Sequence, residues 1–110
     1  MPAGPKSEEA FQRHVVMLAQ MYGWRVMHTR PAMVGGKWMT PIQGDPGFPD
    51  LVLAHPERGI IFAELKTETG KLRAAQRDWS AVLLAANAEW YLWRPDDLNA
   101  IMRRLSLSGP

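Results

Sequence analysis

Apolar residues recur along the chain at two spacings, and these spacings predict its helices and strands. Apolar positions three and four residues apart follow Ser7, a good helix N-cap, and Gly23 is expected to stop this first helix. The same spacing predicts a second helix over 72–86 that ends at Asn87, and Pro95 begins a third. Short apolar or alternating stretches between the helices predict strands over 24–28, 50–55, 60–66 and 89–93.

Each of the two longer helices has one apolar face that is expected to be buried. In the first helix this face consists of Phe11, Val15, Leu18, Ala19 and Tyr22. In the second helix the corresponding residues are Leu72, Ala75, Trp79, Val82, Leu83 and Ala86. Both faces would pack against a sheet built from the predicted strands.

Segments rich in glycine and proline separate these elements. Residues 29–49 carry so many helix and strand breakers that a long loop is expected there, while 1–6 form a loose leader and 106–110 a tail. The turn at 56–59 joins two of the strands into a hairpin. The expected order is α-β-β-β-α-β-α over 1–110, a single α/β domain in which helices flank a mixed sheet.

Composition places the chain in a broad class and excludes several others. It has 110 residues, no cysteine and a net charge of +2, with a pI of about 9.3. Disulfides and thiolate metal sites are therefore excluded. The basic balance permits a polyanionic partner such as nucleic acid. Because there is no apolar run of ~20 residues and no signal-peptide core, we expect a cytoplasmic protein without a membrane partner.

Three charged residues are expected to meet at one corner of the sheet. Asp50 opens one arm of the predicted hairpin and Glu64 lies near the end of the other, so both fall at its open end. Glu64 and Lys66 are two apart on a strand and therefore project from the same face. Two neighbouring carboxylates repel each other unless a cation lies between them, and oxygen ligands suit Mg²⁺ or Mn²⁺. A metal ion beside an ammonium group is equipped to attack a phosphodiester.

The residues at this corner resemble the signature of the PD-(D/E)XK phosphodiesterase superfamily, with Pro49 and Asp50 followed by Glu64, Leu65 and Lys66. The wider pattern of SEEAFQ, GFPDLVL, FAELKTETGKL, AAQRDW and YLWRP is similar to the VRR-NUC branch, the virus-type replication-repair nucleases. This resemblance covers most of the chain and implies a PD-(D/E)XK nuclease core. The alternative is a cluster of solvated charges at a sheet end, which the compound pattern makes the weaker interpretation.

The resemblance also implies roles for these residues. Asp50 and Glu64 would be metal ligands, with the backbone carbonyl of Leu65 as a further ligand. Lys66 would position or activate the attacking water. The implied cofactor is Mg²⁺ or Mn²⁺, without any small-molecule cofactor.

Two further residues match the family pattern on the predicted helices. Gln76 corresponds to the family's glutamine and would face the site from the second long helix, although an exposed helix residue is the alternative. The family also has a glutamate on its first helix, and alignment of the SEEAFQ stretch favours Glu8 over Glu9. An acidic first helical turn would explain both glutamates without any catalytic role.

Several other side chains are candidates for contacts with nucleic acid, because they flank the motif or lie in the long loop. Each of the charged ones could equally be a solvated surface residue. The candidates are Arg25, His28, Arg30, Lys37, Lys71 and the loop tryptophan Trp38.

Together these features favour a metal-dependent DNA endonuclease that selects structured DNA, such as four-way junctions or flaps, in replication, repair or recombination. Cleavage of a four-way junction needs two sites, so a homodimer is expected. The family name indicates a phage or bacterial origin. Two alternatives stay open: a nucleic-acid-binding module that has the fold without turnover, and a restriction-type enzyme that reads a fixed sequence.

Overall fold

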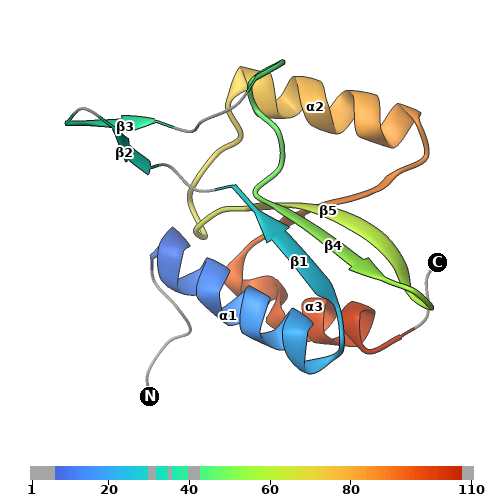
Figure 1. Cartoon of the computed structure of the whole chain (residues 1–110). Helices are drawn as coiled ribbons and strands as arrows, with labels where there is room; N and C mark the ends of the chain where they lie inside the picture. The colour runs from blue at the N-terminus through green and yellow to red at the C-terminus, as the bar shows by residue number, and fades with distance from the viewer. Residues whose placement is uncertain (1–6, 30–31, 35, 40–42, 108–110) are drawn as a thin grey trace.

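The protein is built in layers, with a mixed sheet between helices on its two faces (Figure 1). The structure is a computed structural model that describes residues 7–29, 32–34, 36–39 and 43–107. Helix α1 (Glu8–Met21) and helix α3 (Leu98–Leu105) lie on one face, and helix α2 (Ala74–Ala85) lies on the other. This arrangement confirms the expected α/β class, and the helices and the strands of the main sheet follow one another in the expected order.

The part of the chain that the structure describes contains one sheet of four strands, in the order β1-β4-β5-β6. Strands β1 (Arg25–His28), β4 (Leu51–His55) and β5 (Gly59–Leu65) are antiparallel neighbours, and β6 (Glu89–Trp93) runs parallel to β5. The β5-α2-β6 crossover explains the parallel pair, because parallel neighbours require a long connection. The short 3₁₀ helix η1 (Pro95–Asp97) then leads into α3.

The core lies between the sheet and the pair α1 and α3. Ser7 caps α1, its Oγ accepting a hydrogen bond from the Ala10 N–H at 3.0 Å. After the helix the chain changes direction at Gly23, whose φ is +87°. The expected face of α1 is confirmed, with four of its five residues buried and Tyr22 packed at the margin. The fully buried strand residues on this side are Leu51, Leu53, Ile61, Ala63 and Leu65.

The expected apolar face of α2 is only partly correct. Trp79 and Leu83 are half-buried, but Val82 is 63% exposed. The buried residues of this helix are the polar Gln76 and Ser80. The buried face is therefore displaced from the one that the apolar residues alone predict, toward the polar residues Gln76 and Ser80.

The expected loop at 29–49 contains a second, smaller sheet in the described residues. Strands β2 (Ala32–Val34) and β3 (Lys37–Met39) pair as a short antiparallel hairpin, with Gly36 at φ +79° between them. Three-residue strands can form between breakers when a glycine supplies the turn, so the long-loop prediction was too strong. The predicted leader at 1–6 and positions 108–110 of the predicted tail lie outside the described residues. None of the described helices is long and apolar enough to cross a membrane.

Candidate active site

The β4–β5 hairpin brings Asp50 to Glu64 as expected from its turn position. Leu51 pairs with Ala63 across the ladder, which places Asp50 opposite the end of β5. The Oδ2 atom of Asp50 accepts a hydrogen bond of 2.8 Å from the Leu65 N–H. The register of the hairpin and this bond together hold the Asp50 carboxylate against the strand that carries Glu64.

Glu64 lies on the α2 side of the sheet, because its neighbours Ala63 and Leu65 point into the core on the other side. Its side chain is buried, with 1% of the residue exposed. The Nε2 atom of Gln76 donates a 2.9 Å hydrogen bond to the Glu64 Oε1, and Gln76 is itself buried. The prediction that Gln76 faces this corner from the second long helix thus agrees with its position in the structure.

Gln76 is held in one orientation by a second hydrogen bond. Its Oε1 accepts from the backbone N–H of Arg73 at 2.8 Å, where the chain enters α2. Because the amide oxygen is engaged there, the amide nitrogen is left to face Glu64. The same side chain therefore satisfies a free N–H at the start of the helix and fixes a donor on the buried carboxyl group.

The surroundings of Glu64 disfavour its negative charge. Burial, the side-chain hydrogen bond shared with Asp50 and the charge of Asp50 raise the pKa of Glu64 to about 9, against the opposing effect of Lys66. The two carboxyl groups are thus held together most readily with a proton between them. A cation in the place of that proton would allow both to ionise.

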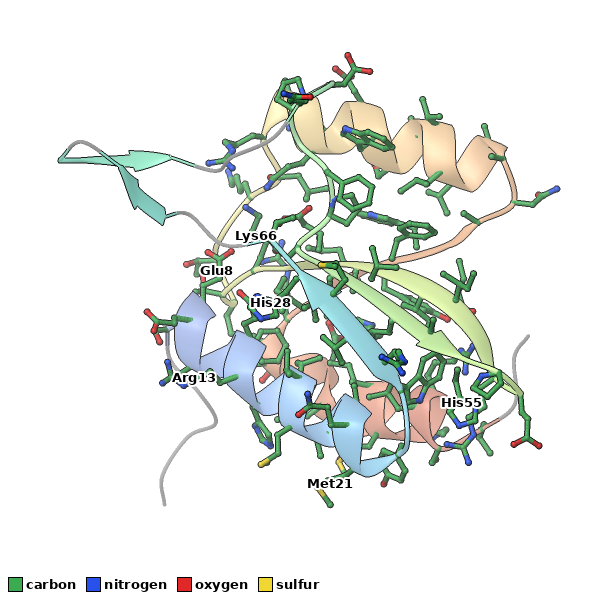
Figure 2. All side chains as sticks on the ribbon, viewed as in Figure 1. Glu8, Arg13, Met21, His28, His55 and Lys66 are labelled. Atoms are coloured by element: carbon green, nitrogen blue, oxygen red, sulfur yellow. The ribbon has the colours of Figure 1, made fainter. Side chains whose placement is uncertain are left out.

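Lys66 and Glu8 complete the corner from two different elements. Only 8% of Lys66 is exposed, and its charge acts on both Glu64 and Glu8. Loss of solvent around its carboxyl raises the pKa of Glu8, with Lys66 and Arg73 opposing this change and Asp50 adding to it. Figure 2 shows Glu8 and Lys66 toward the same end of the sheet.

The structure distinguishes between the two glutamates at the start of α1. The Oε1 atom of Glu9 forms a 2.9 Å ion pair with Arg13, which lies one turn further along the same helix, and both side chains are largely exposed. Glu8 instead has Asp50 and Lys66 as its electrostatic neighbours. The residue that approaches the site is therefore Glu8.

The chain enters the site through a tight passage beside α2. Gly47 has a φ of +91°, and a Cβ atom at this position would lie 2.4 Å from the carbonyl carbon and oxygen of Ala75. Phe48 then packs edge-on between Phe62 and Trp79, with ring centroids 6.1 and 5.0 Å away. Only glycine fits at position 47, so this residue shapes the path of the chain toward Asp50.

The remaining candidates for nucleic-acid contact are distributed unevenly. Arg25 pairs with Ala54 at the far end of β1, away from the corner. His28 lies at the near end but is half-buried, and its Nδ1 is enclosed without a hydrogen-bond partner in the described residues. Lys71 is exposed on the segment between Lys66 and α2. Arg30 is outside the described residues, as are the side chains of Lys37 and Trp38 in β3.

Sequence reasoning missed Arg73 as a neighbour of the site. Arg73 is exposed at the start of α2 and is close enough to Glu8 to oppose the rise in its pKa. In the sequence, Arg73 is marked by its position three residues before Gln76. The relevance of this spacing is visible in the structure, where the Arg73 N–H donates a hydrogen bond to the Gln76 side chain.

The donor set at the corner fits a hard divalent cation that keeps part of its water shell. Among the residues that the structure describes, no group of three or more His, Cys, Asp and Glu side chains is close enough to hold a metal ion. Asp50 and Glu64 supply two carboxylates that interact with each other, and the carbonyl of Leu65, the residue after Glu64, would be the further ligand that the family pattern implies. Mg²⁺ is commonly held by one or two carboxylates with water in its other positions, so this set is sufficient.

Comparisons with known proteins agree with the fold. A family model described as the VRR-NUC domain matches residues 10–94. A solved structure described as a VRR_NUC domain superimposes with a TM-score of 0.62 at 21% sequence identity, covering 87% of this chain and 94% of that one. Among curated proteins, none matches this chain by sequence. The matched region includes Asp50, Glu64, Lys66 and Gln76 and begins just after Glu8.

Proposed function

Because this chain belongs to the VRR-NUC family and has its nuclease-type fold, we propose that it is a metal-dependent endonuclease that hydrolyses phosphodiester bonds in DNA. The observation that carries this proposal is the buried Glu64, which is paired with Asp50 and held by Gln76 beside Lys66. Burial of carboxyl groups together is costly for a protein, and such costs concentrate at functional sites. A site for a divalent cation and a phosphate accounts for all four residues.

Asp50 and Glu64 would hold the metal, together with the Leu65 carbonyl. The cation, Mg²⁺ or Mn²⁺, would supply Lewis-acid stabilisation of the charge on the scissile phosphate. The hydrogen bond from the Leu65 N–H fixes one Asp50 oxygen, and the Gln76 amide fixes one Glu64 oxygen. The oxygens that would bind the metal are therefore oriented in advance.

Lys66 would hold the attacking water and a phosphate oxygen through its ammonium group. Its charge acts on the carboxyl groups of both Glu64 and Glu8, so it would place a positive charge beside the reacting phosphate. Glu8 would face the same water or an outer-sphere water of the metal from α1. These roles follow the residue pattern of the family.

We propose branched or structured DNA as the preferred substrate, in replication, repair or recombination in a bacterial or phage-infected cytoplasm, and a homodimer as the active form. Two copies are needed to cut both strands of a four-way junction symmetrically. Apolar side chains exposed at Ile60, Val82 and Leu84 could contribute to such an interface. Analytical ultracentrifugation of the wild type and of Val82→Ser tests this part separately from catalysis.

A cleavage assay of the purified protein tests the central proposal. Single-stranded, duplex, flapped and four-way-junction DNA would be incubated with Mg²⁺, with Mn²⁺ and with a chelator. The control variants are Glu64→Ala in the site and Glu9→Ala, which removes a glutamate that pairs with Arg13 at the surface. We expect cutting that requires metal, survives Glu9→Ala and is lost in Glu64→Ala.

The other outcomes separate the alternatives. Tight binding without cutting of any shape would favour a nucleic-acid-binding module that lacks turnover. Cutting at one fixed short sequence would favour a restriction-type enzyme. Retained cutting in Glu64→Ala would place the active site elsewhere.

Binding to DNA should depend on salt, because phosphate neutralisation releases counterions. Lys71 and Arg73 are exposed between Lys66 and α2, where they would reach the phosphates that flank the scissile bond. Replacement of Lys71 by Met should lower the slope of log Kd against log salt by about 1. A salt-independent affinity would contradict a backbone-dominated contact.

A further inference from the structure

A residue outside the active corner binds the turn that follows Lys66. Lys66 ends the β5 ladder, with its N–H donating to the Trp93 carbonyl at 3.0 Å. The chain then runs without helix or strand to α2. Lysine carries a long, flexible stem whose ordering is entropically costly. A lysine that is 8% exposed beside irregular backbone therefore needs a structure that holds it.

The turn at Thr67–Gly70 folds back over the Lys66 stem. The Gly70 N–H donates to the Thr67 Oγ1 at 3.1 Å, which closes the turn. A Cβ atom at Gly70 would lie 3.5 Å from both the Cβ and the Cδ of Lys66. The turn thus covers the aliphatic part of the lysine, so its position determines where the ammonium group can lie.

Arg94 binds both ends of this turn. Its Nη1 donates to the Thr67 carbonyl at 2.5 Å and to the Gly70 carbonyl at 2.6 Å. Arg94 is the first residue after β6, and its own N–H is bound by the Asp97 carboxylate at 2.8 Å. Within η1, the Asp96 N–H donates a 2.9 Å hydrogen bond to the Glu68 Oε1. The turn is therefore anchored to Arg94 and to η1 in addition to its own internal hydrogen bond.

We propose that Arg94 is a positioning residue for Lys66: it fixes the Thr67–Gly70 turn over the lysine stem and so holds the ammonium group at the active corner. A guanidinium stays charged and offers several donors in a rigid plane, which suits it to bridge two carbonyls. The catalytic consequence rests on the proposed nuclease function. The effect on Lys66 itself does not.

The chain offers a matched control in Arg58. Its Nη1 also bridges two backbone carbonyls, those of Tyr22 at 2.9 Å and Leu105 at 3.1 Å. It lies at the turn between β4 and β5, the opposite end of the hairpin from Lys66. If the bonds of an arginine to two carbonyls only stabilise the fold, Arg58→Ala and Arg94→Ala should have the same effect on Lys66 labelling. If Arg94 positions Lys66, only Arg94→Ala should change it.

The test measures Lys66 directly and cleavage separately. Both variants and the wild type would be treated with an amine-reactive reagent, and the labelling rate of Lys66 would be read by mass spectrometry relative to exposed Lys71. Single-turnover cleavage and DNA affinity would be measured at a temperature where circular dichroism shows all three folded. We expect Arg94→Ala to raise the Lys66 rate severalfold and to lower single-turnover cleavage by about 10- to 100-fold with little change in Kd.

The other possible results would each contradict a stated part of the proposal or separate it from the proposed function. Equal Lys66 labelling in Arg94→Ala and Arg58→Ala would overturn the proposal. Faster labelling with unchanged cleavage would overturn its catalytic part. If the wild type cuts no DNA, the proposed function fails, and the labelling ratio still decides whether Arg94 holds Lys66. Should Arg94→Ala not fold, Arg94→Gln keeps a polar side chain but loses the charge and reach with which the guanidinium bonds both carbonyls, and unchanged Lys66 labelling in that variant would also overturn the proposal.

Discussion

The two faces of the sheet carry different kinds of residue, although they come from the same strands. On the side of α1 and α3, Leu53, Ile61 and Leu65 are fully buried among apolar neighbours. On the side of α2, Phe62 is half-buried and Ile60 is 56% exposed, and the buried neighbour at the strand end is Glu64. The facing helix buries Gln76 and Ser80 rather than aliphatic residues.

This difference indicates that the two faces of β5 serve different purposes, one stabilising the fold and the other forming the site. Alternate residues of one strand point to opposite faces, so stability and chemistry can be separated by a single residue step. The core side supplies the apolar burial that folds the domain. The α2 side can then hold a carboxyl group whose pKa is raised to about 9, a feature that costs stability in the absence of a cation. Substitutions on the α2 side should therefore reduce cleavage, whereas substitutions on the core side should reduce stability.

Glu64→Gln should have the largest effect on activity and little effect on folding. It should lower cleavage by about a thousandfold or more, because a site that loses a metal ligand loses several kcal/mol of transition-state stabilisation. The melting temperature should stay equal or rise, since the amide removes a buried carboxyl group. Steady-state cleavage and thermal denaturation check both statements. A large fall in melting temperature would mean that Glu64 is mainly structural.

Leu53→Ala should show the reverse pattern. Leu53 is fully buried in the core, so its truncation should cost about 2–5 kcal/mol of unfolding free energy. Cleavage per folded molecule should be unchanged. The neighbouring Val52 points to the other face and is half-buried, so Val52→Ala is the matched control and should cost about 1 kcal/mol. Equal losses in urea denaturation would contradict the proposed asymmetry between the faces.

Gln76→Leu should lower both cleavage and stability moderately, because Gln76 contacts a site residue and also bonds the start of α2. It removes the bond to Glu64 and the bond to the Arg73 N–H. We expect about a tenfold loss of cleavage and about 1 kcal/mol of stability. Gln20→Leu on the exposed side of α1 is the control and should change neither. Wild-type cleavage in Gln76→Leu would show that Glu64 does not depend on this amide.

The smallest effect should come from the ion pair between Glu89 and Arg104, which joins β6 to α3 far from the corner. Although burial acts in the opposite direction, hydrogen bonds from Arg104 and Tyr91 lower the pKa of Glu89 below its ordinary 4.5. A carboxyl group with a lowered pKa in the folded state contributes stability that is present above pH 4.5 and lost as pH falls through the folded value.

Wild type should therefore exceed Glu89→Gln in stability by roughly 1 kcal/mol near neutral pH, and the difference should shrink below about pH 4.5. Urea denaturation between pH 3.5 and 7 measures it, with the exposed Glu57→Gln as control. A difference that does not change over this range would contradict the lowered pKa.

Much of the site was accessible from the sequence because its geometry is local. Alternation along 60–66 places Glu64 and Lys66 on one face, and the turn at 56–59 sets the register that brings Asp50 beside them. The face of α1 is likewise a matter of helical period, and Phe11, Val15 and Leu18 are buried as predicted. Such features depend on residues within one element or one hairpin.

The rest depended on contacts between distant elements, which periodicity does not specify. The apolar period of α2 favoured Val82 on the buried face, yet the helix turns Gln76 inward because its partner is the carboxyl group of Glu64. The two bonds of Arg94 to the turn after Lys66 span more than twenty positions of the chain. The sequence by itself determined which residues could form a nuclease corner and on which face. The tertiary structure alone decided what holds them there, because those partners meet only when separate elements pack together.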